Sequence, residues 1–302
     1  MFIVDMHCDT LSDVNAEVGL VNKYNVSNKN PYLQFFAHYS KRGDTTPEQR
    51  RKKLINSVNV YLSECERLGL INVSSGRDIF RATDHKMPAG MLSIEGGGGL
   101  FADSPELDIA YRAGLRILGL AWDKNELSAS AYDEEDTGLT EEGKKMADRA
   151  SELGIIIDVS HMSDRAFYDL FERSPMPHIA THSNFRELCP MKRNLTREMA
   201  RMIAARGGVI GMNLFPKFLA GEGSGVDDVI RHIDYGLELL GENAIGFGFD
   251  IDGTNGVYPV GINTDSSIHD QVIEALYKRY SASVVERIAG ENILDFLKDN
   301  LM

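Results

Sequence analysis

Residues 140–161, TEEGKKMADRASELGIIIDVSH, contain the unit that decides the fold. Small and apolar side chains recur at helical spacing from Thr140 to Leu153, and Gly154 is placed to end that helix with a left-handed cap. The run that follows, Gly154–Ser160, is apolar at consecutive positions, as in a strand buried on both faces of a parallel sheet. His161 comes directly after it. The stretch therefore predicts a helix, a buried strand and a polar side chain at the carboxyl end of that strand.

The same alternation of strand and helix extends along the whole chain. Apolar β-type runs occur at seven places: Phe2–Asp5, Ala89–Glu95, Leu115–Ala121, Gly154–Ser160, His178–His182, Gly208–Leu214 and Ala244–Asp250. Repeated strand–helix units predict parallel strands joined by right-handed crossovers. We expect an α/β fold in which residues 1–302 form a single (β/α)8 TIM-type barrel domain, an architecture of about 250 residues. Because seven runs are evident and not eight, a doubly wound open sheet is the structural alternative.

Helix signals and two long segments separate these runs. Thr46–Gln49 has the pattern of a capping box with proline in the first helical turn, and Val229–Leu240 predicts another helix closed by Gly241. The segments Val18–Thr45 and Asp123–Leu139 each follow a strand end. Loops of this length inside a compact domain are commonly lids or specificity elements, with a solvated surface loop as the alternative.

Composition excludes several classes of function. The chain has 32 basic and 45 acidic residues and a net charge of −13, which argues against a nucleic acid or an anionic membrane as partner. Three scattered cysteines are too few for a disulfide framework or a thiolate zinc site. No stretch approaches the roughly 20 apolar residues of a membrane span, and the polar residues after Val4 leave no apolar core for a signal peptide. We expect a cytoplasmic protein.

The polar residues that could carry chemistry lie at the ends of the predicted strands. They are His7, Asp9, Glu95, His161, His182 and Asp250. Because the carboxyl ends of parallel strands share one edge, where barrel enzymes build their sites, these side chains are expected to converge. Imidazole and carboxylate ligands without thiolates suit zinc or a similar divalent cation, and four such ligands with one bridging carboxylate could hold two ions about 3.5–4 Å apart.

Other polar residues fit structural roles better. His38, His85, His232 and His269 lie in helical or polar loop surroundings and are expected to be exposed or structural, and His178 opens its strand at the opposite end from the site. Asp158 either orients a ligand histidine or is a buried structural aspartate. Cys8 points away from its neighbours His7 and Asp9 and is expected to be a packed thiol. Residues 96–99, GGGG, lack the lysine of a P-loop and are expected to let the backbone turn sharply beside Glu95.

Taken together, the motifs resemble the renal or membrane dipeptidase family (peptidase family M19), a branch of the amidohydrolase-like metal-dependent hydrolases. The matching stretches, in order along nearly the whole chain, are DMHCDT (5–10), SIEGG (93–97), DVSHM (158–162), THS (181–183), KRN (192–194), GFGFDIDG (246–253) and GENIL (290–294). The resemblance implies that His7 and Asp9 bind one zinc ion and that His161 and His182 bind a second. It further implies that Glu95 bridges the pair.

The resemblance also implies roles near the reacting bond. Asp250 matches the family's catalytic acid/base, although alternation along the strand would put Asp252 on the same face. Arg193 matches the arginine that grips the substrate carboxylate. Well-known members carry a histidine that positions the scissile carbonyl where this chain has Trp122. Trp122 is therefore expected to take part in substrate binding and to alter substrate preference.

The function expected from the resemblance is a dinuclear zinc dipeptidase that hydrolyses small L-Xaa-L/D-Xaa dipeptides, with a homodimer as the expected assembly. One alternative is the same metal chemistry on another amide, such as an N-acyl amino acid, which Trp122 favours. The other is a catalytically silent metal- or peptide-binding protein, which an intact Asp250 beside a full ligand set makes less attractive.

Overall fold

A computed structural model describes residues 1–14, 19–22, 24–39 and 46–301. The strands are β1 (Ile3–Cys8), β2 (Tyr32–Tyr39), β3 (Ile71–Asn72), β4 (Ala89–Glu95), β5 (Ile117–Gly119), β6 (Ile156–Asp158), β7 (Ile210–Met212) and β8 (Ile245–Phe247). The helices are α1 (Thr10–Asp13), α2 (Pro47–Leu68), α3 (Gly76–Asp84), α4 (Pro105–Ala113), α5 (Glu141–Leu153), α6 (Asp164–Arg173), α7 (Arg197–Ala205), α8 (Pro216–Leu219), α9 (Val226–Leu240), α10 (Ile268–Tyr277), α11 (Ala282–Glu286), the π-helical turn η1 (Arg287–Glu291) and α12 (Asn292–Asn300).

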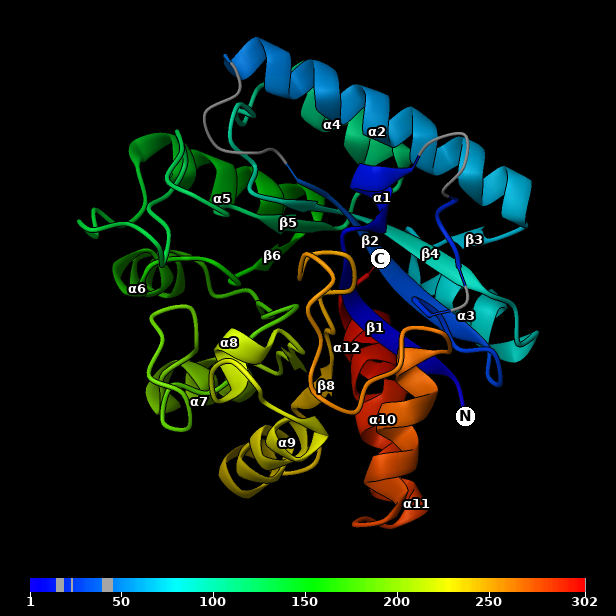
Figure 1. Ribbon diagram of the computed structural model, residues 1–302. Coiled ribbons are helices and arrows are strands. Elements are labelled where there is room, and N and C mark those ends of the chain that lie inside the picture. Colours follow the sequence, from blue (N-terminus) through cyan, green and yellow to red (C-terminus); the bar gives the residue numbers. More distant parts are fainter. Residues whose placement is uncertain (15–18, 23, 40–45, 302) are drawn as a thin grey trace.

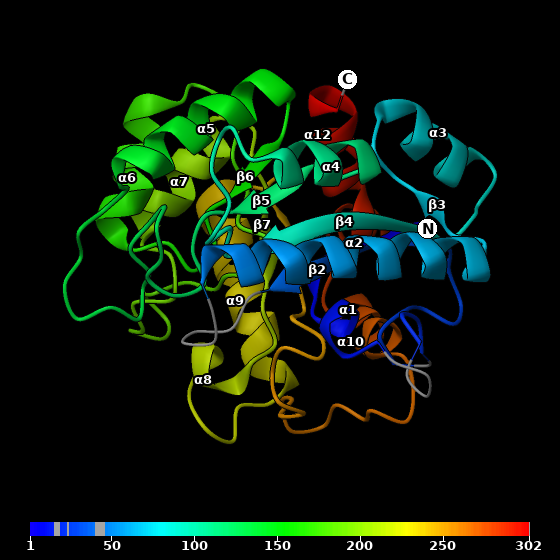
Figure 2. The same cartoon turned by 90° about the horizontal axis from the view of Figure 1, so that it is seen from above.

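The strands form one parallel sheet that curls into a barrel surrounded by helices (Figures 1 and 2). Their order is β6-β5-β4-β2-β1-β8-β7, with the short β3 added beside β4. The barrel closes through residues 179–180, because Ile179 pairs with Asp158, the last residue of β6, and Ala180 pairs with Ile210 of β7. The predicted run His178–His182 therefore occupies a strand position held by single bridges. The (β/α)8 barrel is confirmed.

The sequence prediction misses the two-residue β3 and, among the strands of the main order, β2. β2 lies within Val18–Thr45, so the expectation of a loop there is wrong for Tyr32–Tyr39; residues 18, 23 and 40–45 of that segment lie outside the described ranges. Two polar residues, Gln34 and His38, interrupt its apolar run and hide the strand. Both are buried and satisfied, since the Gln34 amide donates to the Asp5 carbonyl and His38 Nδ1 lies 2.9 Å from Ser57 Oγ.

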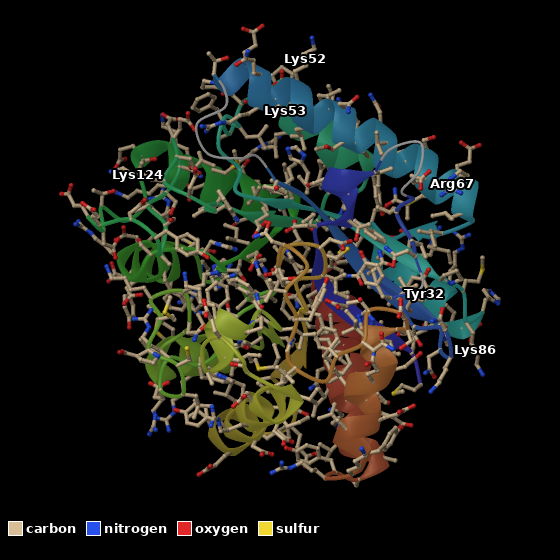
Figure 3. The ribbon with its side chains drawn as sticks, viewed as in Figure 1. Tyr32, Lys52, Lys53, Arg67, Lys86 and Lys124 are labelled. Carbon is tan, nitrogen blue, oxygen red and sulfur yellow. The ribbon has the colours of Figure 1, made fainter. Side chains whose placement is uncertain are left out.

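The helix signals in the sequence are confirmed. Thr46 and Gln49 form the capping box of α2, and Gly69 ends that helix in a left-handed conformation. Lys52 and Arg67 project outward from α2 (Figure 3), while its apolar face packs toward the sheet. In α5 the Thr140 side chain accepts a hydrogen bond from the Gly143 amide, and Gly154 is the left-handed cap.

The apolar core fills the amino-terminal end of the barrel and the space between the sheet and the helices. One cluster joins early strand residues to the final helix and includes Val4, Leu33, Met91, Ile117, Ile156, Val209, Ile293 and Leu297. The opposite, carboxyl end of the strands is lined by buried polar groups. No helix within the described ranges combines the length and apolar character that crossing a membrane requires.

Candidate metal centre

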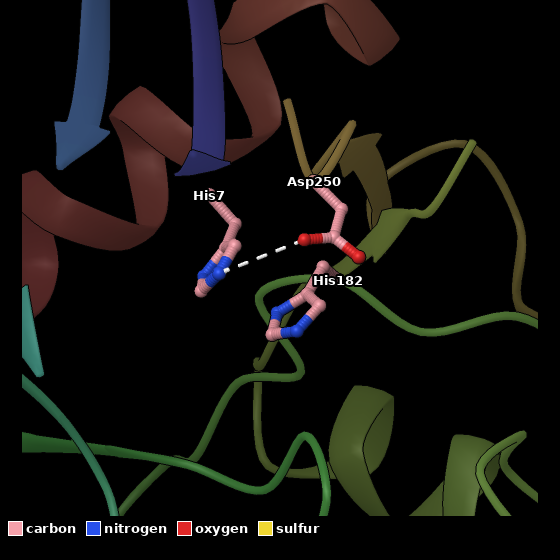
Figure 4. A group of neighbouring side chains, drawn as sticks. All are labelled: His7, His182 and Asp250. Atoms are coloured by element: carbon pink, nitrogen blue, oxygen red, sulfur yellow. Dashed lines mark ion pairs between the residues drawn. The ribbon is translucent and has the colours of Figure 1, made fainter. Parts of the chain in front are cut away.

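Six polar side chains from six places in the sequence converge at the carboxyl end of the barrel. His7 lies on β1, Glu95 ends β4, and the others follow strand positions: Asp9, His161, His182 and Asp250. Each has at most 8% of its surface exposed. Figure 4 shows three of them, with His7 and Asp250 facing each other and His182 alongside. The predicted convergence is therefore present in the structure.

Glu95 lies at the centre of this cluster. Its Oε1 is 2.7 Å from His161 Nε2 and 3.1 Å from His182 Nε2. Its Oε2 faces the other way and is 3.7 Å from His7 Nε2. Two sets of potential ligand atoms, each within 4.8 Å of one another, share this carboxylate: His7, Asp9 and Glu95 form one, and Glu95, His161 and His182 form the other.

The cluster contains buried polar atoms that make no hydrogen bond. Among the residues that the structure describes, these include His7 Nε2, Asp9 Oδ1 and Glu95 Oε2. A buried polar atom without a partner costs about 1–3 kcal/mol, so three of them side by side are unfavourable in an empty site. All three atoms are able to bind a divalent cation when deprotonated. His7 Nε2 is only 3.7 Å from Asp9 Oδ1. The residues present fit a metal ion.

The ionisation of the second set also suits a cation. Burial works against the charged form of Glu95, but the charges of His161 and His7 outweigh it and hold the pKa of this carboxyl well below its usual range. Burial and the nearby Arg193 lower the pKa of His161 to about 4. Burial, with further contributions from His7 and Arg193, holds the pKa of His182 well below its usual range. A carboxylate beside two neutral imidazoles is the protonation state that metal binding requires.

The first set holds a proton instead. Burial opposes protonation of His7, but Glu95 and Asp9 outweigh it and raise its pKa. Burial and the charge of Glu95 raise the pKa of Asp9 to about 7. In the absence of a metal ion a proton thus partly neutralises this crowded group, and a bound cation would take its place.

Asp250 borders both sets. Its backbone has a φ of 59°, in the left-handed region, and its Oδ2 accepts a 2.9 Å hydrogen bond from Asn213. Oδ1 is 3.9 Å from His7 Nε2. Burial, assisted by the charge of Glu95, raises the pKa of Asp250 to about 6. Such a carboxyl can both accept and return a proton near neutral pH.

Asp252, which strand alternation left as a rival, lies elsewhere. Its two carboxylate oxygens accept hydrogen bonds from Tyr24 Oη (2.5 Å) and Thr10 Oγ1 (2.6 Å). Its φ of 67° is also left-handed, so the extended backbone that alternation assumes is absent from this stretch. The structure places Asp250, and not Asp252, in the cluster.

His182 is oriented by a relay that begins at Asp158. Thr181 Oγ1 donates to Asp158 Oδ2 (2.5 Å), so the same hydroxyl must accept the proton of His182 Nδ1, 2.8 Å away. This fixes the tautomer and leaves the lone pair of His182 Nε2 directed at Glu95 and His161. Asp158 therefore orients His182 through the Thr181 hydroxyl. Sequence reasoning missed Thr181, whose only signal is its place before His182.

Arg193 lies beneath the same surface with 4% of its area exposed. Its two terminal nitrogens donate to Ser183 Oγ and to the His182 carbonyl, each at 2.9 Å. Within the described part of the chain its buried Nε makes no hydrogen bond. The Tyr132 side chain also interacts with Arg193, and its ring lies 5.8 Å from the His161 ring. Tyr132 belongs to the segment Asp123–Leu139 and was not singled out from the sequence.

Trp122 forms an aromatic wall beside the centre. Its ring lies 5.9 Å from that of Tyr39 and 6.3 Å from that of His161. The predicted sharp turn after Glu95 is present, since Gly96 has a φ of 73°. A side-chain carbon at Gly96 would come within 2.9 Å of the Trp122 Cβ, so glycine is needed there for close packing as well as for conformation.

The remaining histidines and Cys8 lie outside the ligand sets. His85 is exposed, whereas His38, His178, His232 and His269 are buried. His232 is structural, lying within hydrogen-bonding distance of the Phe185 amide and the Leu219 carbonyl. His269, expected in helical or polar loop surroundings, lies in α10 and is buried against Asp5. Cys8 is a buried free thiol, as expected of a packed residue.

Comparison with known proteins decides the family. Residues 1–300 match the family described as membrane dipeptidase (peptidase family M19). The chain belongs to this family. Its members are metal-dependent hydrolases of the dipeptidase type, in agreement with the ligand sets at the end of the barrel.

Individual relatives agree with this assignment. An uncharacterised protein in the pqqA 5′ region of Klebsiella pneumoniae is 37% identical over 191 residues, which are 59% of this chain and 70% of that protein. Dipeptidase tcpJ of Claviceps purpurea is 28% identical over 227 residues, 74% of this chain and 53% of that protein. A metallopeptidase of Rhodobacter sphaeroides, crystallised with a phosphinate mimic of the dipeptide L-Ala-D-Ala, superposes with a TM-score of 0.87 at 22% identity, covering 100% of this chain and 99% of that one. At that identity the superposition supports the fold.

Zinc added to chelator-treated protein is expected to raise the unfolding temperature, because a ligand that binds only the folded state stabilises it by about 2.7 kcal/mol at a hundredfold excess over its Kd. The Glu95→Gln variant should lose most of this shift, since Glu95 is shared by both ligand sets. Thermal melts monitored by circular dichroism measure the effect. Glu126→Gln, which changes a carboxylate bound to Arg50, is the control and should keep the full shift. Equal shifts in the two variants would contradict the assignment.

Proposed function

We propose that the protein is a dinuclear zinc dipeptidase. His7 and Asp9 would hold one ion, His161 and His182 the other, and Glu95 would bridge them. The observation that carries this proposal is the position of Glu95, whose two oxygens face opposite ligand sets. Imidazole and carboxylate donors without thiolates favour zinc in a catalytic site.

The chemistry divides between the ions and the chain. When bound, two zinc ions lower the pKa of a water molecule at the site and polarise the peptide carbonyl. Asp250 Oδ1 faces the first ligand set, from where it would accept the proton of the attacking water and return it to the leaving amine. Asn213 holds the other oxygen, Oδ2, and so fixes the orientation of the carboxyl group.

Arg193 provides the recognition of the substrate's terminal carboxylate. Arginine has five N–H donors in a planar fork, and two of its nitrogens are already engaged with Ser183 and the His182 carbonyl. These bonds hold the fork in place, while the buried Nε makes no hydrogen bond among the described residues and stays available. A carboxylate is the ligand that this geometry suits best.

Small dipeptides are the proposed substrates, including those with a D-residue at the carboxyl end. This follows from family membership, and it is supported by relatives named as dipeptidases in Claviceps purpurea and Aspergillus oryzae. The Rhodobacter sphaeroides structure with a mimic of L-Ala-D-Ala supports the D-configuration. A buried arginine that grips a terminal carboxylate also favours short free peptides over longer chains.

One observation favours a second candidate, hydrolysis of another amide such as an N-acyl amino acid. Trp122 stands where well-known family members have a histidine that contacts the scissile carbonyl. With Tyr39 and Tyr132 it lines the space beside His161 with aromatic rings. An apolar acyl group would pack there as well as an amino-terminal side chain would. Both candidates use the same metal centre and Arg193.

Asp250→Asn is expected to lower kcat for a small L-Xaa-D-Xaa dipeptide by about 10²–10⁴-fold, because the amide cannot accept the proton of water. Bound zinc should remain, since each of the two ligand sets that share Glu95 is complete without Asp250. Asp252→Asn is the matched control, from the same motif and the same backbone conformation, and should change kcat less than about tenfold. Steady-state hydrolysis and elemental analysis measure the two quantities. Unchanged turnover in Asp250→Asn would contradict the mechanism.

Replacing Trp122 separates the two candidate substrates. Trp122→His is expected to shift the ratio of kcat/KM for free dipeptides over N-acyl amino acids by about tenfold toward dipeptides, because it removes the aromatic wall and restores a polar contact to the carbonyl. Trp122→Phe keeps an aromatic ring and should leave the ratio close to the original. Competition assays with both substrates measure the ratio directly. A ratio unchanged in Trp122→His would remove Trp122 from substrate binding.

A further inference from the structure

Asp5 is a buried carboxylate outside the ligand sets, within an otherwise apolar part of β1. Only 1% of its surface is exposed, yet it makes three hydrogen bonds. Oδ1 accepts from the backbone amides of His7 (3.0 Å) and Phe249 (3.1 Å). Oδ2 is 2.7 Å from His269 Nε2, which comes from the first turn of α10.

The two amides that Asp5 binds belong to irregular stretches of the sheet. On one side, Asp5 pairs with Gln34 and Cys8 with Phe36, so β1 has one residue more than β2 over this interval. On the other side, Asp5 pairs with Phe247 and Cys8 with Ile251, so the chain after β8 has one residue more than β1. Regular pairing is thus lost on both sides of β1 at the same level. The residues that turn into the metal centre there are His7 and Asp250.

A single carboxylate oxygen therefore replaces the ladder bonds that these two stretches give up. The His7 amide belongs to a ligand residue, and the Phe249 amide immediately precedes Asp250, whose left-handed φ directs its side chain into the site. Without the acceptor, two buried N–H groups would lose their partner at the point where the strands diverge. The Asp5 carboxylate thus joins the backbones next to two side chains whose facing atoms, His7 Nε2 and Asp250 Oδ1, are 3.9 Å apart.

His269 holds the other oxygen of Asp5 and packs against the second strand. Its ring stacks on Phe249 with centroids 4.9 Å apart and an angle of 27° between the planes. His269 thus contacts both Asp5 and Phe249, whose backbone amide Asp5 binds, and both His269 and Asp5 have only 1% of their surface exposed. The pair links α10, on the outside of the barrel, to the metal centre.

We propose that Asp5 and His269 are positioning residues that set the geometry of the His7–Asp9 metal site and of Asp250 relative to it. The proposal rests on the proposed function, because it assigns the pair a role toward the metal that His7 binds. A role in stability alone is the competing explanation. If the pair acted on stability alone, removing another buried, hydrogen-bonded carboxylate, such as one on α10, would have the same effect on zinc affinity and kcat.

Asp270 provides that comparison. It is the next residue along α10, has 8% of its surface exposed, and accepts hydrogen bonds from Ser27 Oγ (2.7 Å) and the Asn28 amide (3.3 Å). Its partners lie in the segment before β2 and belong to neither ligand set. Asp270→Ala should therefore lower the unfolding temperature while zinc affinity and kcat stay close to those of the unaltered protein.

The test compares zinc affinity and the split between kcat and KM in Asp5→Ala, His269→Leu, His269→Gln and Asp270→Ala. Zinc affinity is measured by competition with a chelator, without any need for turnover. Asp5→Ala and His269→Leu should each lower the affinity for one of the two zinc ions by about 10–100-fold, as changes to other partners of metal ligands do. Each should lower kcat by a similar factor. KM should change little, because Arg193 is untouched. His269→Gln should restore most of both losses, since its Nε2 can donate to Asp5 Oδ2.

Three results would overturn the proposal: unchanged zinc affinity and kcat in His269→Leu, no recovery in His269→Gln, or equal losses in Asp270→Ala. If Asp5→Ala does not fold, the His269→Leu and His269→Gln pair decides the question alone. Failure of the proposed function would be seen in the unaltered protein, as binding of fewer than two zinc ions or absence of hydrolysis. The positioning role is tested by the differences between variants, so its failure can be told apart from failure of the proposed function.

Discussion

The burial of the Glu95 carboxylate among three imidazoles is the constraint on which the rest of the site depends. A charge in this position is costly to bury unless other groups compensate it. His161 and His182 approach one oxygen and His7 the other. Nearby buried polar atoms that make no hydrogen bond among the described residues would be satisfied by bound cations. Every strand that contributes a ligand must therefore end at the same height, which a closed parallel barrel achieves and an irregular fold does not.

The barrel separates this polar requirement from its need for an apolar core. Side chains near the starts of the strands pack with α12 and stabilise the fold, while the ends of the strands are free to carry charged groups. The transition between the two is abrupt at β1. There Asp5 is buried three positions before Cys8, and the strand loses its regular register on both sides. Left-handed backbone at Gly96, His161 and Asp250 turns the chain into the site once the strands end.

Much of this arrangement could be predicted from the sequence, because it depends on periodicity. Apolar runs followed by polar residues mark seven barrel positions and all six residues of the cluster. β2 was not predicted because Gln34 and His38 are polar residues, which are unusual in a buried strand. Their hydrogen-bond partners are the Asp5 carbonyl and Ser57, which are distant in the sequence. The choice between Asp250 and Asp252 could not be made, since alternation presumes an extended backbone that neither residue has. Tyr132, Asn213 and Thr181 act through contacts that only the folded chain reveals.

Anomalous X-ray scattering at the zinc absorption edge, from crystals of the zinc-loaded protein, tests the central role of Glu95 most directly. We expect two peaks on opposite sides of the Glu95 carboxylate, one beside His7 and Asp9 and the other beside His161 and His182. A single peak, or peaks that Glu95 does not touch, would contradict a centre built around one shared carboxylate.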